Sequence, residues 1–122
     1  TFNSCDPSHP TPVLQIHGTI DGTVPFDGNS ALGMESIPDV IEFWRSYNSC
    51  SLDPVIKIED FFEIGYSVEH QVYGSCLNEV QVELYKVEGM WHTWPKEEDF
   101  GISASKVIWE FFNTYDYNGR MN

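Results

Sequence analysis

The sequence predicts an α/β fold, because its apolar residues follow strand periodicity in some segments and helix periodicity in others. At residues 13–17 a short apolar run ends at a glycine, which suits a buried strand. Residues 67–73 and 80–87 alternate between apolar and polar side chains and predict an antiparallel hairpin. Two main helices are expected over about residues 36–48 and 103–115. Two strand–loop–helix units imply a parallel strand pair joined by a right-handed crossover.

The composition describes one globular domain, or part of one. The 122 residues are 41% hydrophobic and 15% aromatic, enough to bury a core. Their net charge of −13 repels phosphate backbones and anionic lipid surfaces, so we expect neither nucleic acid nor membrane as a partner. No apolar run approaches the roughly 18 residues that span a bilayer. Residues 1–5 lack the basic and apolar regions of a signal peptide.

The first half of the chain begins with an irregular stretch over residues 1–12, which precedes the strand at 13–17. Residues 18–35 carry four glycines and one proline and predict a long loop at the strand's carboxyl end, where α/β proteins keep functional residues. Ser36 is a plausible N-cap for the following helix, which should end near Asn48. The apolar face of this helix comprises Ile37, Val40, Ile41, Trp44 and Tyr47.

The second half of the chain begins with a mixed segment over residues 54–65, in which Val55, Ile56 and Ile58 predict a short strand. The hairpin follows, and residues 89–100 form a second loop at a strand end. In the last helix, the side chains expected to face the core are Val107, Ile108, Phe111, Phe112 and Tyr115.

Three cysteines leave one without a partner inside the chain. Cys50 and Cys76 lie on either side of a hairpin-like segment, and a bridge between them would close a loop of about 27 residues and indicate an oxidising compartment. Cys5 would then be free or paired outside the chain. The alternative, three reduced and buried thiols, stays open on these grounds.

The two long loops carry the residues that point to chemistry. The first reads His-Gly-Thr-Ile-Asp-Gly-Thr-Val-Pro-Phe over residues 17–26, and the second reads Glu-Gly-Met-Trp-His-Thr-Trp-Pro over residues 88–95. This pair resembles the acid and base loops of α/β-hydrolases in the group of secreted polyhydroxybutyrate depolymerases and feruloyl or acetylxylan esterases. The family signatures are His-Gly-Thr-x-Asp-x-x-Val-Pro-Tyr/Phe and Gly-Gly-Gly-His-Thr-Trp-Pro. The resemblance covers about residues 12–115 and includes the last helix.

The resemblance implies that Asp21 is the acid and His92 the base of a Ser-Asp-His triad. A carboxylate that accepts a hydrogen bond from the imidazole leaves the other ring nitrogen free to act as a base, and it stabilises the imidazolium that forms. Asp27 is a competing acid but reads as a turn residue, and His17 reads as structural. His9 and His70 have no motif around them, and we expect them to be exposed.

The resemblance also bears on substrate contacts and on location. Trp91 and Trp94 flank the base and are expected to bind substrate, although packing is the alternative. Met90 and Trp91 replace two glycines of the family signature, so we expect a bulky side chain beside His92 to narrow the pocket or reshape its rim, with Met90 as a third substrate contact. The family often bridges the cysteines that match Cys50 and Cys76, which implies a secreted, extracellular protein.

The fold's chain order places the serine before the acid and the base, yet no Gly-x-Ser-x-Gly elbow occurs in these residues. The chain, residues 1–122, is therefore expected to be the C-terminal portion of an α/β-hydrolase domain, inactive without the N-terminal half that bears the nucleophile. The uncovered edge of the strand at 13–17 would then invite a homo-oligomer.

The leading prediction is thus a serine carboxylic-ester hydrolase that needs no cofactor and acts on acyl or feruloyl esters of polysaccharides or on a polyhydroxyalkanoate. One alternative is a non-catalytic carbohydrate-binding module that uses Trp91 and Trp94. Another, a calcium-binding domain, would need clustered carboxylates such as Asp-x-Asp-x-Asp-Gly, which the sequence lacks.

Overall fold

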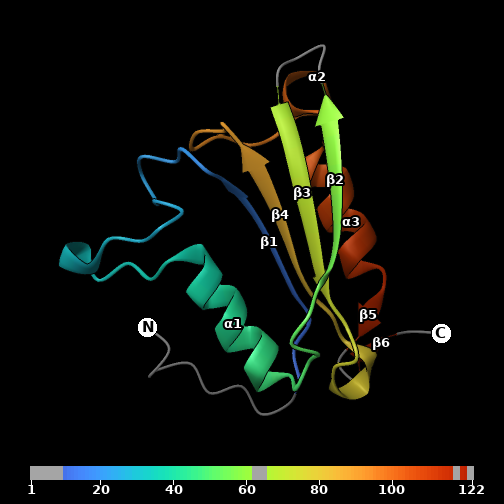
Figure 1. Cartoon of the computed structure of the whole chain (residues 1–122). Helices are drawn as coiled ribbons and strands as arrows, with labels where there is room; N and C mark the ends of the chain where they lie inside the picture. Colours follow the sequence, from blue (N-terminus) through green and yellow to red (C-terminus); the bar gives the residue numbers. More distant parts are fainter. Residues whose placement is uncertain (1–9, 62–65, 117–118, 121–122) are drawn as a thin grey trace.

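A computed structural model describes residues 10–61, 66–116 and 119–120, and the predictions for Cys5 and His9 lie outside these residues. The fold is α/β, with four strands in one mixed sheet (Figure 1). Its strands are β1 (Val13–Gly18), β2 (Val55–Phe61), β3 (Tyr66–Tyr73) and β4 (Val82–Glu88), in the order β1-β4-β3-β2.

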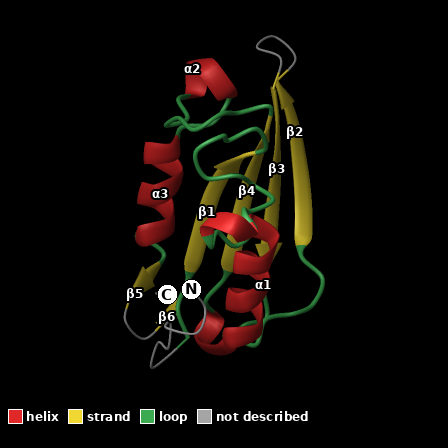
Figure 2. Ribbon diagram, turned by 90° about the vertical axis from the view of Figure 1, so that its left-hand side faces the viewer, coloured by secondary structure: helices red, strands yellow, loops and turns green. Residues whose placement is uncertain are grey.

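Helices cover both faces of this sheet, so the described chain has three layers (Figures 1 and 2). The helix α1 (Ile37–Tyr47) lies on one face, and α2 (Glu97–Phe100) and α3 (Ala104–Phe112) lie on the other. Val82 and Leu84 of β4 pack with Ile37 and Ile41 of α1. On the opposite face, Val87 packs with a second cluster comprising Val68, Met90 and Phe100. Because side chains alternate between the two faces along β4, this strand contributes residues to both cores.

The parallel strand pair is confirmed. β1 pairs with β4 in parallel register, from Val13 opposite Val82 to Gly18 opposite Val87. The carboxyl ends of both strands therefore lie at the same end of the sheet, and the loops after them emerge side by side. The long loop after β1 includes one short 3-10 turn, Ser30–Leu32.

The predicted limits of α1 are confirmed by its capping interactions. The hydroxyl of Ser36 accepts a hydrogen bond from the Asp39 N–H, which satisfies one of the free donors at the helix start. At the other end Asn48 is the C-cap, and its fully buried side chain exchanges two hydrogen bonds with the backbone of Thr11. This contact ties the start of β1 to the end of α1.

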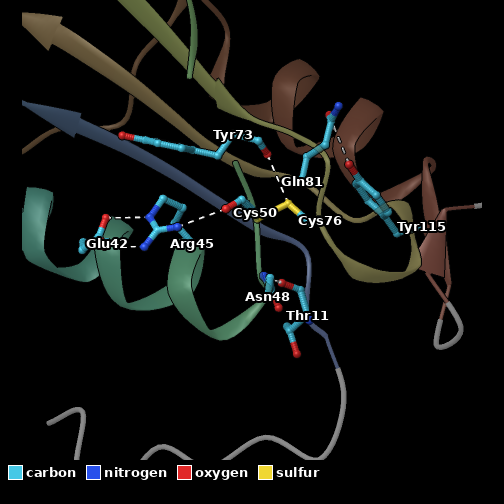
Figure 3. The surroundings of a disulfide bond; sticks show 9 residues. All are labelled: Thr11, Glu42, Arg45, Asn48, Cys50, Tyr73, Cys76, Gln81 and Tyr115. Atoms are coloured by element: carbon cyan, nitrogen blue, oxygen red, sulfur yellow. Dashed lines mark hydrogen bonds and ion pairs between the residues drawn. A yellow bond between two sulfur atoms is a disulfide. The ribbon is translucent and has the colours of Figure 1, made fainter. Parts of the chain in front are cut away.

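The antiparallel hairpin is confirmed, and so is the strand expected from Val55, Ile56 and Ile58, which is β2. β3 pairs antiparallel with β4 and with β2. A disulfide joins Cys50 to Cys76 at the base of the β2–β3 pair (Figure 3), with the 3-10 turn Leu77–Glu79 directly after it. Arg45 of α1 donates to the carbonyl of Cys50 and to the Glu42 carboxylate, so the bridge is fastened to the helix as well.

Two expectations for the last helix are wrong. α3 ends at Phe112, and the Phe112 side chain is 68% exposed instead of facing the core. The buried positions Ala104 and Phe111 are seven residues apart, close to two turns, which places Phe112 about 100° further round the helix. Tyr115 is buried as expected, but it belongs to a short strand, β5 (Tyr115–Asp116), paired with β6 (Gly119–Arg120).

Candidate active site

The two predicted loops meet where β1 and β4 end, and backbone contacts hold them together. The Ile20 N–H donates to the Met90 carbonyl at 3.1 Å, and the Gly89 N–H donates to the Thr19 hydroxyl at 2.8 Å. A Cβ on Gly18 would lie 2.0 Å from the Met90 carbonyl oxygen. Only glycine allows this approach, so the close position of the second loop requires a glycine at the end of β1.

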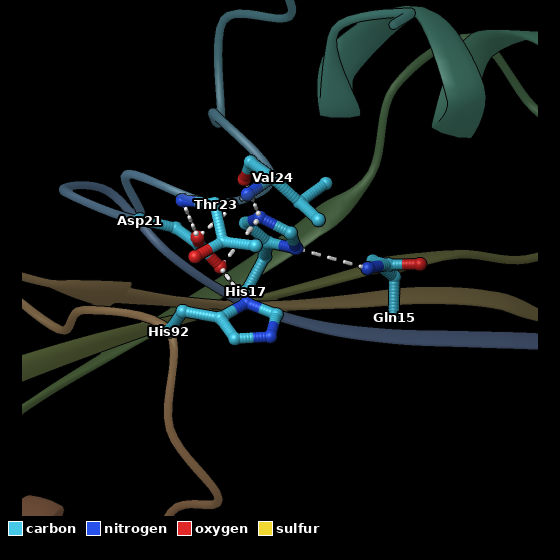
Figure 4. A network of polar contacts seen from close by, with 6 residues as sticks. All are labelled: Gln15, His17, Asp21, Thr23, Val24 and His92. Atoms are coloured by element: carbon cyan, nitrogen blue, oxygen red, sulfur yellow. Dashed lines mark hydrogen bonds and ion pairs between the residues drawn. The ribbon is translucent and has the colours of Figure 1, made fainter.

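Asp21 lies at the centre of this contact (Figure 4). Its side chain is 5% exposed, and each carboxylate oxygen has its own donors. Oδ1 accepts from the Thr23 N–H at 2.9 Å and from the Val24 N–H at 2.8 Å. Oδ2 accepts from His92 Nδ1 at 2.8 Å. The carboxylate is thus anchored by its own turn and directed at the imidazole of the other loop.

These contacts determine the protonation of the carboxyl group. Burial by itself raises the pKa of Asp21, but the hydrogen bonds from the Val24 N–H, from His92 and from the Thr23 N–H outweigh burial. The net effect holds the pKa of Asp21 below its ordinary value of 3.8. Asp21 is therefore ionised near neutral pH and acts only as an acceptor.

His92, unlike Asp21, is largely exposed. Its side chain is 56% exposed, although its Nδ1 atom is bonded to the buried Asp21. Since a carboxylate only accepts, Nδ1 carries a proton, and Nε2 of the neutral ring has a free lone pair. This lone pair belongs to a half-exposed imidazole whose orientation is fixed by a buried anion. Such a group can remove a proton from a hydroxyl that reaches it.

His17 is structural in the way the sequence suggests. Its ring is buried, and Nε2 donates to the Val24 carbonyl at 2.7 Å. The Gln15 side-chain amide donates to Nδ1 at 3.1 Å, which fixes the neutral form with the proton on Nε2. The same Nε2 lies 3.4 Å from Asp21 Oδ2. The ring therefore stabilises the turn whose backbone N–H groups donate to the Asp21 carboxylate.

The sequence reasoning missed Gln15, although one signal was available. In a strand, residues two apart share a face, so Gln15 and His17 were bound to lie side by side on β1.

The three predicted substrate contacts differ in their surroundings. Trp91 and Trp94 are 50% and 57% exposed, next to His92 in the chain. The Trp91 ring packs edge-on against Phe100, with ring centroids 5.3 Å apart, and Trp94 Nε1 donates to the Ser105 hydroxyl. The prediction for Met90 is wrong. Its side chain is 2% exposed and packs in the core, while its backbone makes the contacts with the first loop.

The other candidates lie apart from this pair. Asp27 is exposed and has no hydrogen bond or ion pair in the described part of the chain, in line with a turn residue. The expectation that His70 is exposed is wrong. It lies half-buried on β3, where Nε2 is 2.8 Å from the Glu83 carboxylate and the ring stacks on Tyr85. Both partners come from β4, which the one-dimensional pattern around His70 does not reveal.

No protein-family model and no curated protein matches this chain. Among residues 10–61, 66–116 and 119–120, no three His, Cys, Asp or Glu side chains are grouped so that they could hold a metal ion. None of the helices in that same part of the chain is both long and apolar enough to cross a bilayer.

Proposed function

We propose that this chain supplies the acid, Asp21, and the base, His92, of a Ser-Asp-His triad in a carboxylic-ester hydrolase of the α/β-hydrolase fold. The observation that carries the proposal is the 2.8 Å hydrogen bond between two side chains that are 71 residues apart in sequence. A buried carboxylate bonded to Nδ1 of an exposed imidazole is the arrangement that leaves Nε2 available to a nucleophile. Its position, at the carboxyl ends of neighbouring parallel strands, agrees with the fold.

In the proposed reaction, Nε2 of His92 takes the proton of a serine hydroxyl as that oxygen attacks the ester carbonyl carbon. The C–O bond to the leaving alcohol then breaks, and His92 returns the proton to that alcohol. A water molecule repeats the sequence on the acyl-enzyme and releases the acid. Asp21 keeps its negative charge throughout and stabilises the imidazolium at each stage. The serine and the oxyanion donors would come from a segment outside these 122 residues.

The substrate class rests on the resemblance and on the exposed tryptophans. Trp91 and Trp94 offer exposed aromatic surface within two residues of the base in the sequence, which suits a feruloyl group, a sugar ring or a polyester chain. The net charge of −13 favours neutral over anionic substrates. We propose acyl or feruloyl esters of polysaccharides, or a polyhydroxyalkanoate, as the substrate. The Cys50–Cys76 disulfide supports a secreted, extracellular protein.

The test joins this chain to the N-terminal half of an esterase of the same group and treats the product with a fluorophosphonate, which labels activated serines. Labelling is expected, and His92→Ala should reduce its rate by about 10³-fold or more. His70→Ala is the matched control, since it removes an imidazole whose partners are Glu83 and Tyr85 and not Asp21, and it should leave labelling unchanged. Equal labelling of the His92→Ala and His70→Ala proteins contradicts the proposal.

The second candidate, a carbohydrate-binding module, is favoured by one observation, the half-exposed Trp91 and Trp94 side chains. Stacking of a sugar ring on either indole would change tryptophan fluorescence. Binding of xylan oligosaccharides that is lost in Trp91→Ala and Trp94→Ala but retained in His92→Ala would favour binding over catalysis.

A further inference from the structure

The strand β2 forms an open edge of the sheet, on the side opposite β1 (Figure 2). β3 pairs with its inner side, and no strand in the described part of the chain pairs with its outer side. Alternate N–H and C=O groups along that side therefore lack a strand partner. An edge of this kind is a template for pairing with another strand.

Exposed apolar side chains stand on this edge strand, although exposed edges normally carry charged ones. Ile56 and Ile58 share one face of the strand and are 52% and 60% exposed, and Val55 on the other face is 74% exposed. Two charged side chains, Lys57 and Glu59, alternate with them on the Val55 face. Their charged atoms are 3.9 Å apart and well exposed. The outer edge of β2 thus has an apolar face and a face that carries both signs of charge.

We propose that β2 is a docking surface for a second copy of this chain. Two β2 strands would pair antiparallel about a two-fold axis through Ile58, so that the two sheets become continuous. Such a contact is isologous, because each copy contributes the same strand. The inference does not depend on the proposed esterase function, and it concerns the edge opposite the one that would complete the hydrolase sheet.

Charge complementarity supports this occupant and this register. With the axis at Ile58, Lys57 of each copy lies directly opposite Glu59 of the other, which makes two equivalent pairs of opposite charge. On the other face the two Ile58 side chains are opposite each other, and each Ile56 lies diagonal to the second copy's Ile58. The apolar contact of this register is therefore the one between the two Ile58 side chains, with each Ile56 diagonal to it and directly opposite position 60 of the other copy.

Neighbouring registers lack this complementarity. Directly opposed residues must point to the same face, so the axis perpendicular to the sheet passes through a residue. An axis through Lys57 would oppose the two Lys57 ammonium groups, and an axis through Glu59 would oppose the two Glu59 carboxylates. Like charges directly opposite each other are destabilising. Among these three registers, the sequence of β2 therefore favours the one centred on Ile58.

The association is expected to be weak. One strand per copy buries little area, and each copy carries a net charge of −13, which repels the other. Sedimentation velocity is therefore run at an ionic strength of about 0.15 M, where the long-range repulsion is screened and contacting charges still interact. The unmodified 122-residue chain is expected to show a concentration-dependent dimer at or below about 0.5 mM, as befits a contact in the weak size class.

A charge exchange tests the register. Lys57→Glu places a second carboxylate opposite Glu59 of the other copy, and Glu59→Lys places two ammonium groups opposite each other. Each variant should therefore raise the dimer dissociation constant by about tenfold or more. An equimolar mixture of the two variants should restore association as a heterodimer, because every pair then has opposite charges. The double variant Lys57→Glu/Glu59→Lys should associate like the unmodified chain.

Matched control variants distinguish the effect of this contact on association from the effect of net charge. Lys106→Glu and Glu98→Lys change the net charge by the same amounts at exposed positions of α3 and α2, away from β2, and should leave the dissociation constant unchanged. Circular dichroism establishes that each variant is folded. The proposal is overturned by a chain that stays monomeric up to about 0.5 mM. It is equally overturned if Lys57→Glu and Glu59→Lys leave the dimer dissociation constant unchanged, or if the mixture of the two variants fails to associate.

Discussion

At the scale of single residues, the two oxygens of Asp21 have separate tasks. Oδ1 accepts the Thr23 and Val24 N–H groups, and Oδ2 orients His92. In Asp21→Asn the side-chain oxygen would keep the two backbone donors, and its NH₂ group would face His92 Nδ1. That nitrogen would have to accept, so the ring would carry its proton on Nε2, the tautomer that cannot act as a base.

Proton-detected nitrogen NMR of the imidazoles distinguishes these tautomers in the 122-residue chain. His92 is expected to be the Nδ1–H form in the native chain and the Nε2–H form in Asp21→Asn. In the joined esterase, the same substitution should slow serine labelling by about 10³–10⁴-fold. An unchanged tautomer would contradict the assigned role of Oδ2.

The low pKa of Asp21 also makes one contribution to stability depend on pH. The unfolded carboxyl group titrates near 3.8 and the folded one below it, so the contribution is fully present above that value. It is lost as pH falls through the folded pKa. The difference in unfolding free energy between the native chain and Asp21→Asn, measured in urea, should shrink as pH falls below about 4. A difference that grows as pH falls through this range would contradict the direction of the shift.

The residues of the site were predictable to different degrees. Asp21 and His92 stand in long loop patterns at strand ends, which is why the sequence alone singled out both. Met90 was misjudged, because adjacency to His92 in the chain does not tell whether a loop side chain points outward or into the core. The partners of His70 come from another strand, and only the pairing of β3 with β4 reveals them.

At the scale of elements, Gly18 sets how closely the two active-site loops approach. Gly18→Ala places a methyl group against the Met90 carbonyl, so the loops must separate. We expect a loss of about 1–3 kcal/mol in unfolding free energy, and a weaker Asp21–His92 hydrogen bond. Gly74→Ala is the control, because nothing lies within 4 Å of its added Cβ, and it should change stability by less than about 1 kcal/mol. Equal effects at both positions would contradict the role of Gly18.

The disulfide is a second device at this scale. It joins positions 26 residues apart and encloses the β2–β3 pair, so it restricts the unfolded chain most in that region. The double variant Cys50→Ser/Cys76→Ser should lower the unfolding free energy by about 3–4 kcal/mol, as measured by denaturant titration under oxidising conditions. The same loss is expected when the native chain is reduced. No change on reduction would contradict a formed bridge.

The elements themselves were largely predictable from periodicity and capping residues, whereas their exposed sides were not. The limits of α1 follow from Ser36 and Asn48, and the parallel pair follows from the order of strands and helices. Phe112 was expected inside because it is apolar. Burial also depends on where α3 lies against the sheet, and its contacts with β1 and β5 leave Phe112 outside.

At the scale of the whole molecule, the sheet has two different edges. β2 is exposed on both faces, whereas β1 lies beside a groove lined by apolar side chains that include Leu14, Trp94 and Ile108. A further strand laid along β1 would have a place for its side chains. This difference agrees with the proposal that β1 adjoins the rest of a hydrolase sheet, or a second copy in its place, and it leads to a measurement on individual amides.

Amide hydrogen exchange can report which side of β1 is covered. The N–H groups of Val13 and Thr19 donate to carbonyls on the β4 side, and by the two-residue period those of Gln15 and His17 do the same. The N–H groups of Leu14 and Ile16 then point away from β4, to the side of β1 on which no described strand lies. In dilute protein these two amides should exchange at least about tenfold faster than those of Gln15 and His17.

Concentrating the protein should protect the Leu14 and Ile16 amides if a second copy pairs with β1, and an association through β2 should leave them unprotected. If both sets are equally protected in the dilute chain, another segment already covers β1, and neither a second copy nor a missing half has an edge there to complete.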